Sequence, residues 1–260
     1  MSDGARTLPV VAVDDLWAGY DGTPALESVS FELGAGQLVG VAGPNGSGKS
    51  TLLKALLGLI KPWRGRVELF GRPIDNVRQR VGYAPQSELV DWEFPATVAD
   101  VVLMGRYGRI GLLRPPKAVD RDAVASALAQ VRLNALAGRQ IGELSGGQQR
   151  RMLIARALAQ EADLLLLDEP MVGLDATTQH DLLELFETLR DAGKTLLVAT
   201  HDLSCVAACF DLTLLLNRRL VAFGPPNEIF TPAILSEAYA EHLLMLPTEG
   251  GVYVGHHGHG

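Results

Sequence analysis

Two segments of this 260-residue chain carry residue types that could bind and cleave a polyphosphate. The first is the run GPNGSGKST at 43–51, which follows an apolar stretch and precedes the helical run TLLKALLGLI. In such a loop the glycines let backbone N–H groups approach phosphates, the lysine reaches the outer phosphates, and the serine hydroxyl can bind Mg²⁺. We therefore expect Lys49 and Ser50 to take these two roles.

The second segment is the run LLLLDE at 164–169, in which an acidic pair ends an apolar stretch. Asp168 is expected to hold Mg²⁺ through its water shell, and Glu169 to orient or deprotonate an attacking water. An acidic pair is a weak signal alone, but together with the phosphate loop it predicts phosphoryl transfer to water. Such a reaction requires positioning of the water, neutralisation of charge and exclusion of solvent.

A third segment, LSGGQQRR at 144–151, has the composition of another anion site at the start of a helix. The hydroxyl of Ser145 and the N–H groups of Gly146 and Gly147 could hold an oxyanion there. The alternative is an ordinary capped helix whose apolar residues simply pack. These residues would be Leu153, Ile154, Ala157 and Leu158.

The elements that must position these segments are predicted from the hydrophobic pattern. Uninterrupted apolar runs at 38–43, 163–169 and 195–200 are typical of parallel strands buried on both faces. Alternating runs at 10–20 and 25–33 predict a small antiparallel sheet, and 212–224 reads as a hairpin turning at 217–219. The fold class is therefore predicted as α/β, with a P-loop core and a flanking antiparallel β-subdomain.

A helical insertion is predicted between the glutamine at 86 and the leucine at 144. Thr97 and Asp100 can cap a helix with three valines on one face, a Pro-Pro pair interrupts at 115–116, and a further helix is expected at 123–131. We interpret 1–260 as a single domain. Its parts are 1–86 (β-subdomain and first part of the core), 87–143 (helical subdomain), 144–224 (rest of the core) and 225–260 (a C-terminal helical segment with a histidine-containing tail).

Composition and charge exclude some classes of partner and location. The net charge of −7 is unlike the basic surface that binds nucleic acid phosphates, so no nucleic acid partner is expected. No apolar run reaches the roughly 18 to 20 residues that cross a bilayer, and the first residues lack the apolar core of a secretion signal, so we expect a cytosolic protein. Cys205 and Cys209 form a helical stripe with His201 that could bind a metal, although inward packing of the two thiols is the simpler interpretation.

The motifs and their order resemble those of the ATP-binding subunits of ABC transporters, over nearly the whole chain. They are the phosphate loop, Gln86, LSGGQ at 144–148, LLLLDE, GLD at 173–175 and His201. The resemblance implies a head-to-tail dimer, most simply a homodimer. In it the signature residues of one subunit close over the γ-phosphate held by the other; these are Ser145, Gly146, Gly147 and Gln148.

The resemblance also implies roles for individual residues, with ATP and Mg²⁺ as cofactors. Tyr20 would stack on adenine, His201 would bond the γ-phosphate, Gln86 would report the state of that phosphate, and Asp175 would couple the two sites of the dimer. The catalytic set is then Glu169, His201, Gln86 and Lys49, and the Mg²⁺ set is Ser50, Gln86 and Asp168. The ATP-binding set is Tyr20, Gly43, Pro44, Asn45, Gly46, Ser47, Gly48, Lys49, Ser50 and Thr51.

The segment 87–108 is similar to the corresponding part of manganese, zinc and iron importers, with its acidic-Trp, Phe-Pro-x-Thr-Val and Met-Gly-Arg-Tyr pattern. Met171 stands where these ATPases tend to have an aromatic residue. The resemblance implies membrane permease subunits, an extracytoplasmic binding protein acting indirectly, and a peripheral position on the cytoplasmic side of the membrane. Trp92 and Phe94 are either a permease-facing patch or the core of the insertion.

Three alternatives remain open from the sequence. The chain could serve an importer of iron chelates or vitamin B12, whose ATPases look much alike. It could be a non-transport ATPase acting on ribosomes or DNA, although such proteins usually carry two cassettes or long coiled coils. The tail residues His256, His257 and His259 are either a metal-binding segment or a solvated tail.

Overall fold

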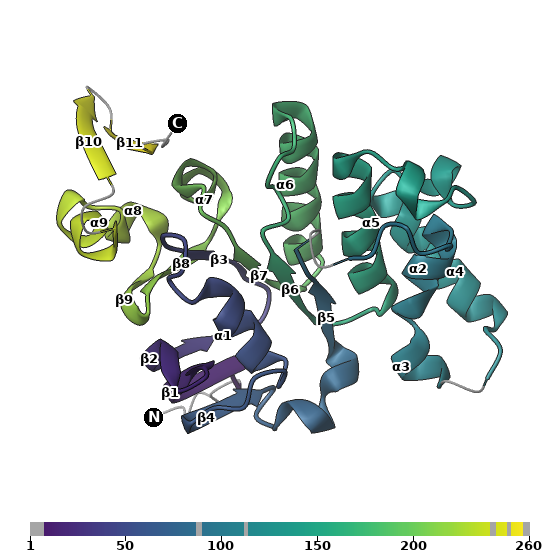
Figure 1. Ribbon diagram of the computed structural model, residues 1–260, viewed down its shortest axis with the longest axis horizontal. Helices are drawn as coiled ribbons and strands as arrows, with labels where there is room; N and C mark the ends of the chain where they lie inside the picture. Colours follow the sequence, from purple (N-terminus) through teal and green to yellow (C-terminus); the bar gives the residue numbers. More distant parts are fainter. Residues whose placement is uncertain (1–7, 87–89, 112–113, 240–242, 249–250, 257–260) are drawn as a thin grey trace, which may run out of the picture. The chain divides into compact units, whose positions relative to one another are not determined.

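The computed structural model describes residues 8–86, 90–111, 114–239, 243–248 and 251–256 (Figure 1). The chain divides into two compact units, Met1–Asn76 with Ala199–Gly260, and Val77–Val198. Within the described residues, no helix is both long and apolar enough to pass through a membrane. The predicted α/β class is confirmed, because each unit combines helices with buried parallel strands.

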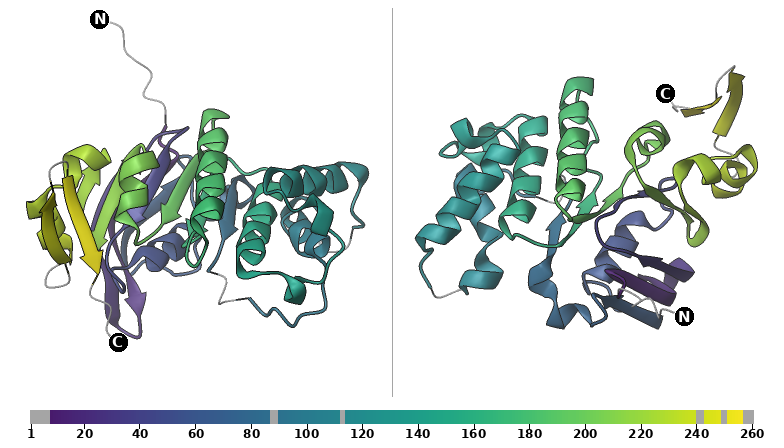
Figure 2. Two further views of the ribbon diagram at one scale, coloured as in Figure 1. Left: turned by 90° about the horizontal axis from the view of Figure 1, so that it is seen from above. Right: turned by 180° about the vertical axis from the view of Figure 1, so that it is seen from behind.

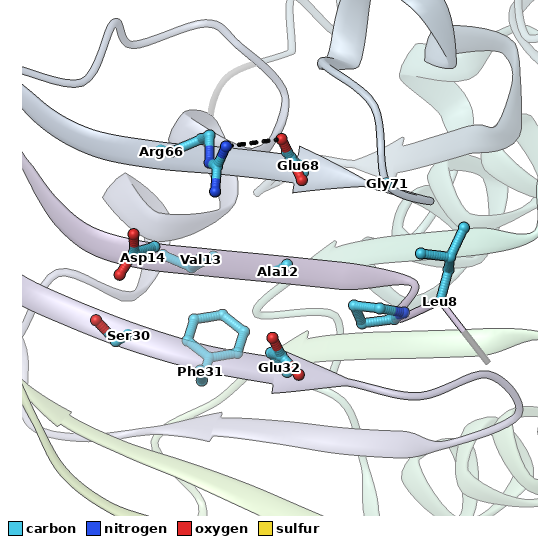
Figure 3. Close-up of a pocket in the computed structure, with 11 residues that line it drawn as sticks. Leu8, Ala12, Val13, Asp14, Ser30, Phe31, Glu32, Arg66, Glu68 and Gly71 are labelled. Atoms are coloured by element: carbon cyan, nitrogen blue, oxygen red, sulfur yellow. Dashed lines mark ion pairs between the residues drawn. The ribbon is translucent and has the colours of Figure 1, made fainter. Parts of the chain in front are cut away.

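An antiparallel sheet forms part of the first unit, as predicted from the alternating runs. Its order is β2-β1-β4, with β1 at Val11–Tyr20, β2 at Thr23–Leu33 and β4 at Arg64–Leu69. The turn between β1 and β2 has positive φ at both Asp21 and Gly22, the pattern of a type I′ hairpin. One face of this sheet bears a groove lined by polar side chains of all three strands, including the ion pair of Arg66 with Glu68 (Figure 3).

Parallel strands form the core of the first unit. Strand β3 (Leu38–Ala42) is fully buried and pairs in parallel with β8 (Leu212–Asn217), which pairs antiparallel with β9 (Arg219–Gly224). The hairpin turns at Arg218, which has φ 60, as predicted. The helices of this unit are α1 (Lys49–Leu56), α7 (Leu203–Cys209), α8 (Pro226–Ile229) and α9 (Pro232–Tyr239), with a 3-10 turn at Ile74–Asn76.

The end of the chain differs in part from the prediction of a helical segment at 225–260. Helices α8 and α9 occur as expected, but a hairpin of β10 (Leu243–Thr248) and β11 (Gly251–His256) follows them. The runs LLML and VYV hold residues that favour strands, and the Thr-Glu-Gly-Gly between them suits a turn. Of the three tail histidines, His257 and His259 lie outside the described residues.

In the described part of the second unit, three strands lie in the order β5-β6-β7, with the unit boundary falling near the end of β7. They are β5 (Val81–Ala84), β6 (Leu164–Asp168) and β7 (Thr195–Ala199). Every residue of β6 and β7 is buried, as their uninterrupted apolar runs predict. Helices α5 (Gly146–Ala159) and α6 (Ala176–Asp191) complete this part, with a 3-10 turn at Arg78–Arg80.

The predicted helical insertion lies in the second unit, where α2 (Val98–Met104) and α4 (Ala118–Gln130) pack against each other and against α5 (Figures 1 and 2). Thr97 and Asp100 form the expected capping box, and the three valines of α2 are buried. Helix α4 begins at Ala118, earlier than the predicted 123, because Asp120 accepts a bond from the Lys117 N–H at 2.9 Å and caps the helix there. Short elements connect these helices: α3 (Tyr107–Ile110) and 3-10 turns at Asn134–Leu136 and Ile141–Glu143.

Candidate functional site

The phosphate loop of the first unit joins β3 to α1 and depends on glycine at two positions. Gly43 has φ 151, and a Cβ there would lie 2.1 Å from the Leu216 backbone oxygen. Gly48 has φ 100, and its Cβ would lie 2.6 Å from the Ala25 backbone oxygen. Both residues therefore need a backbone that side chains rarely adopt and space that no side chain could share. The tip of the loop at Asn45 and Gly46 is exposed.

Lys49 is held inside this loop rather than extended into solvent. Its side chain is buried, and Nζ donates hydrogen bonds to the backbone oxygens of Gly43 at 2.8 Å and Pro44 at 3.0 Å. The loop closes on itself through the Ser47 N–H, which donates to Pro44 at 3.1 Å. The ammonium group is thus already directed at the loop, where phosphate oxygens could replace the two carbonyls.

The start of α1 has the features of an anion site. Its N-cap is Gly48, and no side chain caps it. Ser47 Oγ is buried and has no hydrogen-bond partner among the described residues, so the loop contains a polar atom that a ligand could satisfy. Ser50 is half-buried in the first turn and Thr51 is buried. A helix start with backbone N–H groups and a lysine suits a polyphosphate.

His201 and Tyr20 belong to the same unit as the loop. The Thr200 N–H donates to the Val41 oxygen at 3.0 Å, so the segment leading to His201 runs beside the end of β3, just before Gly43. His201 itself is exposed. Tyr20 ends β1 at the type I′ turn and is 49% exposed, so its ring is available for stacking.

The cysteines following His201 behave as packed thiols. Both lie on α7 and are half-buried, and Asp202 caps the helix by accepting from the Ser204 and Cys205 N–H groups at 3.0 Å each. Burial, assisted by Asp202 and Cys209, raises the pKa of the Cys205 thiol to about 12. The described part of the chain shows no group of three or more side chains suited to a metal ion.

The acidic pair lies in the second unit at the end of β6. Asp168 is buried, and Glu169 follows it with φ 51, a left-handed conformation that costs about 1–3 kcal/mol for a residue other than glycine. Strand β5 pairs in parallel with β6, and the last registered pair joins Ala84 to Leu167. Gln86 and Glu169 each lie two residues beyond that pair, so the structure brings them to the same edge of the sheet.

The LSGGQ segment begins α5 as a capping box. Gln148 N–H donates to Ser145 Oγ at 3.4 Å, and the Ser145 N–H donates to Gln148 Oε1 at 3.0 Å. A Cβ on Gly147 would lie 3.3 Å from Leu174 Cδ2, so the start of α5 lies beside the start of α6. Asp175 caps α6 by accepting from the Thr178 N–H at 2.9 Å, a bond that lowers the pKa of Asp175.

The helix predicted from the LSGGQ segment is present. Of the four apolar residues expected to pack, Leu153, Ile154 and Ala157 are buried and Leu158 is half-buried. Ser145 and Gly146 remain exposed. The capping interpretation and the anion-site interpretation are therefore compatible, because the Ser145 hydroxyl accepts in the cap and keeps its own hydrogen to donate.

Two arginines that support these segments were not predicted. The backbone N–H of Arg218, in the β8–β9 turn, donates to the Ser47 backbone oxygen at 2.9 Å. The backbone oxygen of Arg218 accepts from the Glu27 N–H at 2.8 Å, so this turn ties the loop to β2. Arg106 is buried and bonds Asp120 at 3.1 Å and Glu161 at 2.6 Å. The burial of Arg106 has no signal in its neighbouring residues, and these bonds of Arg218 are made by its backbone, so neither role was visible in the pattern.

The profile of the family described as ABC transporter matches residues 26–172, more than half of the chain. The chain belongs to this family. The resemblance drawn from the motif order is thereby confirmed, and ATP hydrolysis is the activity that the family supports. The match includes the phosphate loop, Gln86, the LSGGQ segment and the acidic pair.

Individual relatives of this ABC protein match over nearly their full length. It is 44% identical to the manganese transport system ATP-binding protein MntB of Halalkalibacterium halodurans, over 95% of this chain and 98% of the relative. It is 46% identical to the zinc transport system ATP-binding protein TroB of Treponema pallidum, over 92% and 90%. A solved inward-facing transporter assigned to the metal-chelate ABC type superposes with TM-score 0.79 at 33% identity, over 95% and 96% of the two chains.

Proposed function

We propose that this ABC ATPase energises the import of a divalent transition metal, manganese, zinc or iron. The observation that carries the proposal is its 44% and 46% identity to the manganese and zinc system proteins, over at least nine-tenths of each chain. The matched length extends beyond the nucleotide motifs and includes the helical insertion.

We assign the chemistry to residues of both units. Lys49 and the N–H groups at the start of α1 would bind the β- and γ-phosphates of ATP, and Tyr20 would stack on the adenine. Hydroxyl, amide and carboxylate oxygens are the ligands that Mg²⁺ prefers, and Ser50, Gln86 and Asp168 offer this set. When bound, Mg²⁺ neutralises charge on the phosphates.

Hydrolysis would depend on a water held at Glu169. The left-handed backbone of Glu169 supports this role, since strained residues cluster where side-chain direction matters for function. Glu169 would accept a proton from the water as it attacks, Gln86 beside it would orient the water, and His201 would steady the γ-phosphate. The proton leaves the site from Glu169 after phosphate departs.

Exclusion of solvent would require a second subunit, most simply a second copy of this chain. The exposed Ser145, Gly146 and Asp175 lie at the starts of two adjacent helices, a surface suited to close over the γ-phosphate of the partner. Hydrogen-bond donors directed at developing charge in a dry site give strong transition-state stabilisation. ATP binding would close the dimer and hydrolysis would reset it.

The helical insertion would dock onto permease subunits at the cytoplasmic face of the membrane, and communicate indirectly with an extracytoplasmic binding protein. Phe94 is 51% exposed, Tyr107 is 43% exposed and Met104 is 37% exposed, so this part of the chain presents apolar side chains to solvent. An apolar groove of about 350 Å³ runs between α2 and α4, lined in part by Leu103, Val124 and Leu128. Contiguous apolar surface such as this groove is a feature of protein interaction sites.

The proposal is tested by measuring cellular manganese, zinc and iron by mass spectrometry in a strain that lacks this chain. The strain is restored with the native chain, with Glu169→Gln, or with Glu184→Gln as a control that changes an exposed glutamate of α6. We expect one metal to fall and to recover with the native chain and the control only. Unchanged levels of all three metals under limitation would contradict the proposal.

A second candidate is the import of an iron chelate, favoured by the similarity to the metal-chelate type transporter. In that case the same strain would take up free metal ions normally and would lose uptake of iron supplied as a chelate. The two candidates therefore differ in the form of iron that the strain requires.

A further inference from the structure

The tip of the β8–β9 hairpin contacts both the phosphate loop and β2. Strands β8 and β9 pair up to Asn217 and Arg219, which leaves Arg218 alone at the tip with φ 60. Its backbone N–H donates to the Ser47 oxygen at 2.9 Å, and its backbone oxygen accepts from the Glu27 N–H at 2.8 Å. Strands β2 and β9 are also in contact (Figure 1). The backbone of a single residue is therefore held between the strand and the loop.

The side chain of Arg218 reaches toward the first residues of β2. Its Nη2 donates to the Pro24 backbone oxygen at 3.0 Å and lies 2.7 Å from Glu27 Oε1. Pro24 directly follows Thr23, which pairs with Tyr20 across the β1–β2 hairpin. The guanidinium thus holds β2 one residue away from the partner of Tyr20, the residue that we assign to adenine stacking.

The start of β2 also lies directly against the phosphate loop. A Cβ on Gly48 would lie 2.6 Å from the Ala25 backbone oxygen and 2.6 Å from Leu26 Cδ2. Strand β2 therefore meets the loop at Gly48 and is joined to it a second time through Arg218. These contacts connect the end of the β1–β2 hairpin to the phosphate loop within the first unit.

Neither the turn nor the ion pair by itself requires arginine at 218. A φ of 60 is a left-handed conformation that glycine adopts freely and other residues adopt rarely. Neutralisation of Glu27 does not require it either, because Arg219 donates to the same carboxylate at 2.9 Å and 3.1 Å. The contact that Arg218 adds is the bond to Pro24. Strained residues of this kind are often associated with function.

ATP has two ends that bind in different ways, a purine ring and a chain of phosphates. Contacts at both ends of one ligand reinforce each other only when the two binding places are held at the right spacing. A spacing that is fixed before binding also lowers the entropy cost of binding. Tyr20 lies at the end of a hairpin whose turn, Asp21 and Gly22, is exposed. A tie from this hairpin to the phosphate loop would fix the spacing.

We propose that Arg218 is a positioning residue that fixes Tyr20 relative to the phosphate loop, through its side chain on Pro24 and its backbone on Ser47. In this role Arg218 strengthens ATP binding without touching the nucleotide. The inference deepens the proposed function and rests on it, because it takes Tyr20 as the adenine contact and 43–51 as the phosphate site.

The test is a double-mutant cycle of Arg218→Met and Tyr20→Ala in the full chain, with ATP affinity from calorimetry and KM and kcat from ATP hydrolysis. Methionine removes the guanidinium and leaves the backbone bonds of the turn in place. In Arg218→Met we expect Kd and KM to rise about 3- to 10-fold, the size of one lost hydrogen bond, with kcat at saturation nearly constant. In the Tyr20→Ala background the same change should alter Kd by less than about 2-fold, because no ring remains to be positioned.

Arg219→Met is the matched control. It removes the same charge one residue further along and from the same Glu27 carboxylate, but Arg219 makes no bond to Pro24 within the described part of the chain. The control should bind ATP as the native chain does. Native affinity in Arg218→Met would overturn the proposal. An equal loss in Arg219→Met would also overturn it, because the effect would then come from charge alone.

The cycle separates positioning of Tyr20 from a general effect on the fold. If the losses from Arg218→Met and Tyr20→Ala simply add, Arg218 acts independently of Tyr20 and the proposal is wrong. If Arg218→Met does not fold, Arg218→Gly takes its place, because glycine adopts φ 60 without strain and keeps both backbone bonds. Native ATP affinity in Arg218→Gly would then overturn the proposal.

Failure of the proposed function is distinguishable from failure of this inference. If the native chain binds no ATP, the nucleotide site itself is wrong. If Tyr20→Ala binds ATP at native strength, the adenine assignment fails, and the inference fails with it. If Tyr20→Ala weakens binding and Arg218→Met does not, only the role of Arg218 fails.

Discussion

The ammonium nitrogen of Lys49 and the backbone oxygen of Gly43 lie 2.8 Å apart, joining the two ends of the phosphate loop through a side chain of the loop itself. A second bond from the same nitrogen reaches Pro44 at 3.0 Å. The lysine therefore has two functions, to shape the loop before nucleotide arrives and to attract the phosphates when it does.

Lys49→Ala removes both functions and should abolish measurable ATP affinity. The charge that attracts the outer phosphates disappears, and the loop loses the donor that holds its carbonyls. Calorimetry with ATP measures the effect directly. Lys54→Ala, on the last turn of the same helix, is the control and should bind normally. ATP binding by Lys49→Ala at native strength would refute the assignment of this loop.

Glu169→Gln should keep ATP binding and lower turnover about 10²- to 10⁴-fold, as expected when a general base is lost. The amide preserves the shape of the side chain but cannot accept the proton of the attacking water. An ATP-bound dimer should accumulate and be visible by size-exclusion chromatography. Glu184→Gln should hydrolyse ATP at the native rate. Normal turnover in Glu169→Gln would show that another group activates the water.

Phe94→Ala should uncouple transport from hydrolysis. Of the two aromatic residues left open by the sequence, Phe94 is 51% exposed and Trp92 is half-buried, so the core interpretation does not hold for Phe94. The variant should keep its Tm and its isolated ATPase activity, while metal uptake in cells falls. Leu59→Ala, an exposed apolar residue of the first unit, is the control. Native uptake in Phe94→Ala would exclude this residue from the permease contact.

Arg106→Met should destabilise the helical insertion by on the order of 3 kcal/mol, because it leaves the buried carboxylate of Asp120 without its cation. Urea unfolding at neutral pH measures the loss. The control is Arg109→Met, whose guanidinium is 41% exposed and 3.6 Å from Glu161. Its effect should stay below about 1 kcal/mol. Equal stability losses in the two variants would contradict the importance of burial.

We also expect Arg106→Met to change how the stability of the fold depends on pH. The hydrogen bond from Arg106 lowers the pKa of Glu161 in the folded protein. A carboxyl with a lowered folded pKa stabilises the fold above its unfolded pKa and loses that contribution as pH falls through the folded value. The native chain should therefore lose stability below the usual glutamate range, and Arg106→Met should lose less over that same interval. A larger loss of stability on acidification in Arg106→Met than in the native chain would be opposite to this expectation. It would exclude the Arg106–Glu161 pair as the cause of the pH dependence.

The sequence by itself determined the motifs, the class of fold and most elements. Strands β3, β6 and β7 were predictable because buried parallel strands need uninterrupted apolar runs, and the capping box of α2 because its geometry is local. The start of α4 was missed by several residues, because Asp120 fixes it by a hydrogen bond that has no periodic signature. The hairpin at the C-terminus was missed for a related reason, since short alternating runs predict strands weakly.

Only the tertiary structure decided which residues support the site from a distance. Arg218, through its backbone, and Arg106, through its side chain, contact segments elsewhere in the chain, and nothing in their neighbouring residues indicates these partners. The left-handed backbone of Glu169 is likewise a result of how β6 ends. Glycine spacing and charge can be read directly from the sequence, whereas a buried ion pair such as Arg106 with Asp120 forms only after separate elements have packed together.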